Sequence, residues 1–214
     1  MAQTAARAGT ALAVAAWRAL ELALAAALLV AAGPLLLAAA AAIRLDSPGP
    51  VLFRQRRVGM AGRSFQLLKL RTMVVHADPA PHRDHVRRLM SGSSSEPWAP
   101  MTADPRVTRA GRVLRRFALD ELPQLWNVLR GDMSLVGPRP ALPYEVELWS
   151  ARQRRRLAVR PGITGLWQVA ARGSADFQTM VELDLTYIAR RSPWLDLCIL
   201  ARTPAAVLRI RSAR

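Results

Sequence analysis

A long apolar run near the N-terminus is the strongest pattern in the sequence. It extends from Ala19 to Ile43, is bracketed by Arg18 and Arg44, and contains one charged residue, Glu21. A helix needs about 20 apolar residues to cross a bilayer, whereas the apolar part of a secretory signal has only about 7–15. The run therefore predicts a membrane helix rather than a cleaved signal.

Gly33 and Pro34 lie near the middle of this run. Proline removes a backbone donor and clashes with the preceding turn, so the pair predicts a break in the helix. Two topologies remain open: a kinked helix that spans the bilayer, and a re-entrant helix that bends at Gly33–Pro34 and returns to the same face. Basic residues on both sides of the run suit the second. We expect residues 1–18 to form a separate short interfacial helix.

Alternation of apolar and polar residues begins after the turn at 46–50. Two β-prone runs, 51–58 and 63–70, flank a four-residue loop that begins and ends with glycine, which predicts a β-hairpin. The period of two places Lys69 on the same face as Phe65 and Leu67. The chain thus divides into an N-terminal membrane segment, residues 1–45, and a larger domain, residues 46–214.

Helical spacing recurs through the larger domain. Arginines at this spacing predict a basic helix at 107–117, and an apolar stripe predicts a helix that starts around 120 and ends before Gly131. We also expect a helix at 176–191. The apolar stretch 194–210 contains Arg202 and Pro204, so we expect it to be interfacial or packed rather than spanning. The composition of residues 76–103 predicts a loop with a short helix at 83–90. We expect His82 and His85, both in this loop region, to be solvated rather than metal ligands.

Composition narrows the function classes. The formal net charge is +16, and the single cysteine rules out an internal disulfide framework. Aromatic residues make up 6% of the chain and no helix-turn-helix or zinc pattern is evident, so we expect no nucleic-acid partner. Beside a membrane segment, the positive charge favours an anionic lipid bilayer and phosphorylated substrates. Lys69 is the only lysine among 31 cationic residues, which indicates a need for a compact ammonium there.

Asp120 and Glu121 are the leading candidates for chemistry. At a helix start, the helix dipole and the cations Arg112, Arg115 and Arg116 are expected to keep Asp120 ionised. An ionised carboxylate can attack phosphorus, and the second carboxylate can hold Mg²⁺. The alternative is that both acids merely cap the helix.

Arg139 is a second candidate, because prolines on both sides restrict its backbone. A guanidinium held in this way suits bidentate phosphate binding. A solvated arginine in a proline-rich turn is the competing interpretation.

Six motifs in sequential order resemble the bacterial sugar transferase family, the monotopic phosphoglycosyl transferases also called polyprenyl-phosphate hexose-1-phosphate transferases. They are Ser47–Gly59, Lys69–Met73, Asp104–Arg112, Leu119–Asn127, Gly131–Pro140 and Arg160–Val169. The resemblance implies a mainly α fold with small β-hairpins (α+β) and a re-entrant membrane helix broken at Gly33–Pro34. It also implies a short form of the family, which lacks the multi-helix N-terminal region of longer relatives.

The function implied by the resemblance is transfer of a sugar 1-phosphate from a UDP-sugar to undecaprenyl phosphate, with release of UMP. Asp120 would be the nucleophile that forms a covalent phosphosugar intermediate, and Glu121 would assist through Mg²⁺. Phosphate ligands would be Lys69, Arg71 and Arg139, with Arg112 as a further candidate. Residues 46–214 would form a catalytic domain on the cytoplasmic face of the bacterial inner membrane, acting early in a surface glycoconjugate pathway such as exopolysaccharide synthesis.

The sequence departs from the family pattern at Leu70, at Ala118 and at residues 170–172, where the role of Arg172 stays open. A non-catalytic membrane scaffold of the same fold is the main alternative. It has no need to retain the acid pair, Lys69 and the Pro-Arg-Pro turn together.

Overall fold

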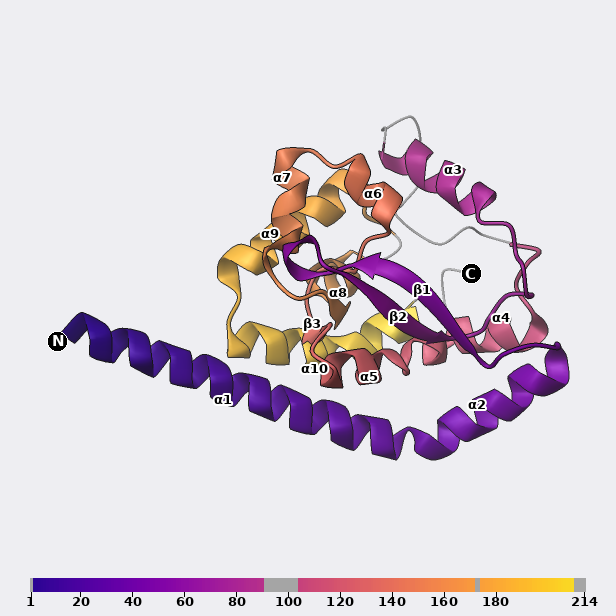
Figure 1. The fold of residues 1–214 in the computed structure, drawn as a ribbon, viewed down its shortest axis with the longest axis horizontal. Coiled ribbons are helices and arrows are strands. Elements are labelled where there is room, and N and C mark those ends of the chain that lie inside the picture. Colours follow the sequence, from indigo (N-terminus) through magenta and orange to yellow (C-terminus); the bar gives the residue numbers. More distant parts are fainter. Residues whose placement is uncertain (1, 91–103, 172–173, 210–214) are drawn as a thin grey trace.

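The computed structural model describes residues 2–90, 104–171 and 174–209, so Arg172 lies outside the described residues (Figure 1). The α-helices are α1 (Ala2–Ala31), α2 (Gly33–Asp46), α3 (Ala80–Met90), α4 (Arg109–Arg116), α5 (Gln124–Leu129), α6 (Pro143–Glu147), α7 (Ala151–Arg154), α8 (Leu166–Ala170), α9 (Phe177–Arg190) and α10 (Pro193–Arg209). The strands are β1 (Leu52–Val58), β2 (Ser64–Leu70), β3 (Ser134–Val136) and β4 (Gly162–Thr164). Short 3₁₀ turns occupy η1 (Met60–Gly62), η2 (Leu119–Glu121) and η3 (Arg155–Ala158). The expected mainly helical fold with small sheets is confirmed.

The apolar run forms two helices joined at Ala32, and the predicted break at Gly33–Pro34 is confirmed. In Figure 1, α1 runs beneath the rest of the molecule and α2 turns up toward α4. The expected separate helix at residues 1–18 is wrong, because residues 2–18 continue into the apolar run as one helix. Alanine has the highest helix propensity and no breaker intervenes. Among the described residues, one segment, Ala13–Ala31, is long and apolar enough to cross a membrane.

Glu21, the one acid in the apolar run, faces the protein. Its Oε1 accepts hydrogen bonds from the Ser134 hydroxyl and, at 2.6 Å, from the backbone N–H of Leu135. Its Oε2 is 2.5 Å from the Arg18 guanidinium, which also donates to the Val128 carbonyl at 2.8 Å. The side chain is 7% exposed. These bonds satisfy the carboxylate and fix α1 against β3 and α5.

The two small sheets differ in topology. β1 and β2 pair antiparallel, with Phe53 opposite Lys69, so the predicted hairpin is confirmed and Lys69 lies at the end away from the turn. β3 and β4 pair in parallel, not as a second hairpin. Gly162 is required there, since a Cβ at this residue would lie 2.1 Å from the Gly137 nitrogen. Strands of three residues are too short to show the period of two from which a strand is predicted.

Apolar contacts bring the hairpin, α5 and α1 into one core. Leu67 of β2 packs in a buried cluster with Leu125 and Val128 of α5 and with Ala25 of α1. A smaller cluster joins α2 to the other end of β2 and to α4 through Ala39, Ile43, Leu70 and Leu114. Both ends of the apolar run are therefore packed against the same domain.

Helix α9 and the C-terminal apolar stretch agree with the sequence. Asp176 caps α9 by accepting a hydrogen bond from the Thr179 N–H at 2.7 Å, so this helix begins where the spacing predicts. α10 continues through Pro204 and packs against α8, β3 and β4, as expected for a packed rather than a spanning segment. Its Asp196 accepts a hydrogen bond at 3.2 Å from the Trp17 indole of α1.

Replacing Glu21 with leucine should destabilise the protein by about 3–5 kcal/mol, because it leaves the Leu135 N–H without its acceptor and Arg18 without its counter-ion. For a domain of this size, that corresponds to a fall in Tm of about 6–20 °C. Thermal unfolding in detergent measures it. Glu21→Gln keeps an acceptor oxygen and should lose less. An unchanged Tm for Glu21→Leu would contradict this account of how α1 is fixed.

Candidate active site

Lys69, Asp120 and Glu121 converge at one point. The Lys69 Nζ lies 2.8 Å from Glu121 Oε1 and 3.8 Å from Asp120 Oδ2. Lys69 comes from the end of β2 and the two acids from η2. The structure therefore brings together the only lysine and the acid pair that the sequence analysis selected. An ammonium between two carboxylates can also attract the phosphate of a substrate.

The turn before η2 directs Asp120 inward. α4 ends at Arg116, and Ala118 adopts a left-handed conformation with φ 55° and ψ 23°. A non-glycine residue there is unusual and stores backbone strain, a feature typical of functional sites. After this reversal Asp120 is 8% exposed, while the Glu121 side chain is 27% exposed. The two adjacent acids therefore have different environments and can take different roles.

Asn127 fixes β2 relative to the acid pair. This α5 side chain is fully buried; its Oδ1 accepts a hydrogen bond from the Leu68 N–H at 3.0 Å, and its Nδ2 donates to the Gln66 carbonyl at 2.8 Å. The amide thus completes the hydrogen bonding of the strand immediately before Lys69. The sequence analysis missed Asn127, although an amide beside the apolar stripe of a predicted helix is a usable signal.

Burial dominates the electrostatics of Asp120. It raises the pKa of this carboxyl above its ordinary value, and Glu121 raises the pKa further, while Lys69 and Arg115 lower it. The expectation that the helix start and nearby cations would lower this pKa is wrong in direction. Asp120 lies in a 3₁₀ turn rather than the first turn of an α-helix, and loss of hydration outweighs the cations.

Among the cations of α4, Arg115 is the one whose charge lowers the Asp120 pKa, and its Nε donates to Thr72 Oγ1 at 2.9 Å. The sequence analysis grouped Arg115 with its neighbours but did not select it as a site residue. Arg112, which it did select, is exposed and donates weakly, at 3.4 Å, to the Val107 carbonyl at the start of its own helix. Helical spacing alone could not tell which of the two faces the acid.

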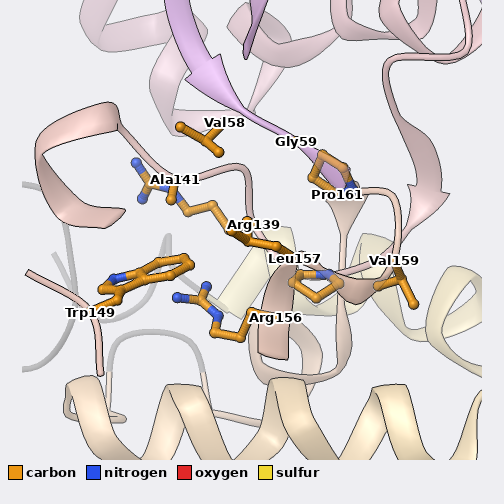
Figure 2. Close-up of a pocket in the computed structure, with 10 residues that line it drawn as sticks. Val58, Gly59, Arg139, Ala141, Trp149, Arg156, Leu157, Val159 and Pro161 are labelled. Carbon is orange, nitrogen blue, oxygen red and sulfur yellow. The ribbon is translucent and has the colours of Figure 1, made fainter. Parts of the chain in front are cut away.

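Arg139 lines a separate pocket with Arg156, Trp149 and Gly59 (Figure 2). The Pro-Arg-Pro turn is held on both sides: the Gly162 N–H donates to the Pro138 carbonyl at 2.9 Å, and buried Arg57 donates to the Pro140 carbonyl at 2.9 Å. The turn therefore presents Arg139 rigidly, as the flanking prolines predict.

Arg57 links this pocket electrostatically to the acid pair. Burial lowers its pKa to about 10; the Arg139 cation contributes to the lowering, while Glu121, Glu145 and Tyr144 oppose it. Arg139 and Glu121 therefore both act on the same buried guanidinium. Asp120, Glu121 and Lys69 do not line the pocket.

Arg71 lies away from the acids. Its guanidinium is 5% exposed and donates to the carbonyls of Ser47, at 2.7 Å, and of Pro48 and Ile43. These carbonyls are at the end of α2. The structure thus places Lys69 and Arg71, two residues apart on the chain, in different surroundings.

His82 and His85 belong to α3, which starts slightly before the predicted helix, and the expectation that they are solvated is wrong. His82 Nδ1 lies 2.9 Å from the Tyr144 hydroxyl, and His85 is buried. Burial lowers the His82 pKa to about 4, and the cations Arg139 and Arg57 lower it further. The positive field of those two arginines thus extends to α3.

The acid pair also determines which metal site is possible. Among residues 2–90, 104–171 and 174–209, no three His, Cys, Asp or Glu side chains converge into a protein-only metal site. Mg²⁺ commonly takes one or two protein carboxylates and completes its shell with waters and substrate phosphates. Asp120 and partly exposed Glu121 fit that pattern, with Glu121 the more accessible ligand.

Comparisons of the chain with a family model and with known proteins indicate the same family. A family model described as bacterial sugar transferase matches residues 12–210. The chain is 45% identical over 175 residues to a UDP-glucose:undecaprenyl-phosphate glucose-1-phosphate transferase of Caulobacter vibrioides, covering 78% of this chain and 60% of that protein. It is 40% identical over 168 residues to the exopolysaccharide production protein ExoY of Rhizobium meliloti, covering 77% of this chain and 73% of that protein.

A third relative is an undecaprenyl-phosphate galactose phosphotransferase of Salmonella typhimurium, 40% identical over 161 residues, which cover 75% of this chain. The chain spans 34% of the length of that protein and a similar share of two other relatives.

The pKa of the Asp120 carboxyl should respond in opposite directions to two substitutions. Arg115→Gln removes a cation and should raise the pKa, whereas Glu121→Gln removes an anion and should lower it. NMR titration of protein labelled at the aspartate carboxyl carbon measures both. Arg116→Gln, an exposed neighbour on the same helix, is the control. Equal shifts for Arg115→Gln and Arg116→Gln would show that the response is nonspecific.

Proposed function

The chain belongs to the bacterial sugar transferase family, and from the geometry of its acid pair we propose that it transfers a sugar 1-phosphate from a UDP-sugar to undecaprenyl phosphate, releasing UMP. The observation that carries the proposal is that the carboxylates of buried Asp120 and partly exposed Glu121 both lie within 4 Å of the Lys69 ammonium. The printed names of the Caulobacter and Salmonella relatives supply the two substrate classes. A scaffold without chemistry has no use for a buried carboxylate held in this way.

Asp120 is the better nucleophile of the two acids. Glu121 is engaged by Lys69 at 2.8 Å, whereas Asp120 lies farther from the same ammonium, at 3.8 Å. Burial raises the pKa of Asp120, and a more basic carboxylate is a stronger nucleophile once it is ionised. Lys69 and Arg115 oppose the protonation of Asp120 and so favour the ionised form that attacks.

The reaction proceeds in two displacements at one phosphorus. An Asp120 carboxylate oxygen bonds to the phosphorus that carries the sugar, and the bond from that phosphorus to the bridging oxygen breaks, so UMP leaves with the electron pair. An oxygen of the lipid phosphate then bonds to the same phosphorus and Asp120 leaves as a carboxylate. Lys69 and Arg139 stabilise phosphate charge in both displacements, and exposed Arg112 is a further candidate ligand.

Glu121 is the residue through which Mg²⁺ would be held. The ion, when bound, would neutralise diphosphate charge and improve UMP as a leaving group. Glu121 orients Lys69 in the free protein, and an arriving diphosphate would compete with Glu121 for the same ammonium.

Asp120→Asn should abolish UMP release, with a loss on the order of 10³-fold or more, because the amide cannot form the acyl phosphate. The assay uses purified protein in detergent with a panel of UDP-sugars, undecaprenyl phosphate and Mg²⁺. A mass increase on the peptide containing Asp120, seen with donor alone, would identify the covalent intermediate.

Asp84→Asn is the matched control, because Asp84 is an exposed acid that lies 4.0 Å from the Arg87 guanidinium. Chelation of Mg²⁺ should stop release by the wild type. Folded Asp120→Asn protein with full activity would exclude Asp120 as the nucleophile. Folded wild type that releases no UMP with any donor would favour the scaffold alternative.

The two helices of the apolar run support a re-entrant arrangement at the cytoplasmic face of the inner membrane. At one end, Arg18 and Glu21 bond to Val128 and Leu135, and at the other, Asp46 bonds to Ala110. A helix that crossed the bilayer would place one of these ends on the side opposite the domain.

Thiol labelling of a single introduced cysteine tests the membrane topology of the apolar run. In a Cys198→Ser background, Ala2→Cys should react with a membrane-impermeant thiol reagent only after the cells are permeabilised, because both ends of the run face the cytoplasm. A cysteine introduced at exposed Arg63 provides the cytoplasmic reference. Labelling of position 2 in intact cells would establish a spanning helix instead.

A further inference from the structure

The end of α2 lies between the two chain segments that build the acid site. One segment is the end of β2 with the residues after it, which carries Lys69. The other is α4 with the turn after it, which leads to Asp120. Each segment has its own polar connection to the last turn of α2 or the residues that follow.

Arg71 makes the first connection. Its guanidinium donates to the carbonyls of Ile43 and Ser47, at 3.4 and 2.7 Å, and also to that of Pro48. The Ile43 carbonyl also accepts the Ser47 N–H at 3.2 Å. Carbonyls at and beyond a helix C-terminus carry partial negative charge, so a buried cation is stabilising there. Gly49 leaves the room this needs, because a Cβ would lie 2.5 Å from the Arg71 Nη1.

Asp46 makes the second connection. Its Oδ2 accepts a hydrogen bond at 2.8 Å from the Ala110 N–H in the first turn of α4. This N–H has no partner within the helix, and a carboxylate is favourable at a helix N-terminus. A charged group at the end of α2 therefore fixes the start of α4, whose other end turns through Ala118 toward Asp120.

The two segments also meet each other at Thr72. Its carbonyl accepts a hydrogen bond from the Thr108 N–H at 3.1 Å, and its hydroxyl accepts one from Arg115 at 2.9 Å. Gly111 packs so closely that a Cβ there would lie 2.1 Å from the Thr72 carbonyl oxygen. Displacement of α2 would therefore act on both segments at once.

We propose that Arg71 and Asp46 are positioning residues, which couple the end of the membrane helix α2 to the distance between Lys69 and Asp120. The proposal rests on the proposed function, because its consequence is for turnover. Arg71 then acts through α2 rather than on a substrate phosphate, although its Nε is a buried donor without an acceptor among the described residues. Its Nη1 and Nη2 already donate to carbonyls and its side chain is 5% exposed.

Steady-state kinetics distinguish a positioning residue from a phosphate ligand. Arg71→Lys keeps the charge but replaces two separated guanidinium nitrogens with one, so it cannot reproduce the contacts to the carbonyls of Pro48 and Ser47. Asp46→Ala removes an anion that has no affinity for phosphate. Both should lower kcat by about 10- to 100-fold, the size expected from a small misplacement of reacting groups. KM for the UDP-sugar should stay within about twofold. Asp46→Asn retains an acceptor oxygen and should recover most of the loss.

The double variant, Arg71→Lys with Asp46→Ala, should lose less than the product of the single losses, because both act through α2. Arg54→Lys and Asp84→Ala, at exposed positions, are the matched controls. A raised KM with retained kcat in Arg71→Lys would identify Arg71 as a phosphate ligand. Full activity in Asp46→Ala would contradict the proposed positioning role of the Asp46–Ala110 hydrogen bond.

Hydrogen exchange in lipid nanodiscs tests the coupling without any reaction, so it still decides the matter if the wild type proves inactive as a transferase. Both variants should accelerate exchange in the peptides covering 66–73 and 109–122, although each changes one connection only. Acceleration confined to the residues beside each substitution would overturn the proposal. Thermal unfolding of the same samples verifies that the compared proteins are folded.

Discussion

The amide of Asn127 is the interaction on which the site depends most. It bonds to the backbone of β2 at Leu68 and Gln66, and it belongs to the helix that follows the acid pair. Side chains of a strand alternate between two faces, so a slip of one residue in β2 would turn Lys69 away from Asp120. A strand pair alone does not prevent such a slip. The buried amide fixes the register because it accepts from the Leu68 N–H and donates to the Gln66 carbonyl, and a shifted strand would lose both bonds.

The chemistry of the site follows from two opposing effects on one carboxyl. Burial raises the pKa of Asp120, and the Lys69 and Arg115 cations oppose this rise without cancelling it. With burial alone the acid would be a proton carrier, and with the cations alone it would be a weak nucleophile. Its neighbour Glu121, more exposed and directly paired with Lys69, remains available for a different task. The asymmetry between two consecutive residues arises from the left-handed turn at Ala118.

Local patterns accounted for much of this structure. The break at Gly33–Pro34, the hairpin that carries Lys69 and the helix α4 all depend on residues adjacent in sequence, and all were predictable. The burial of Asp120 was not, because it results from packing of β2 and α4 around η2. Arg71 is a comparable case: the family resemblance implies a phosphate ligand, and no local pattern indicates that carbonyls at the end of α2 accept its hydrogen bonds. The parallel pairing of β3 with β4 left no periodic signal.

The hydrogen bonds from Ser134 and Leu135 to Glu21 have a consequence for the order of events during synthesis. Its partner Ser134 is 113 residues further along the chain. At translation rates of about 5–20 residues per second, roughly 6 to 23 s pass between the two. Throughout that interval the Glu21 carboxylate has its local partner Arg18 but lacks the Ser134 and Leu135 donors, and a carboxylate with unfilled hydrogen bonds resists burial in hydrocarbon. The docking of α1 on β3 through Glu21 can therefore begin only once residues 134 and 135 have been made, so the position of α1 on the domain is fixed late in folding.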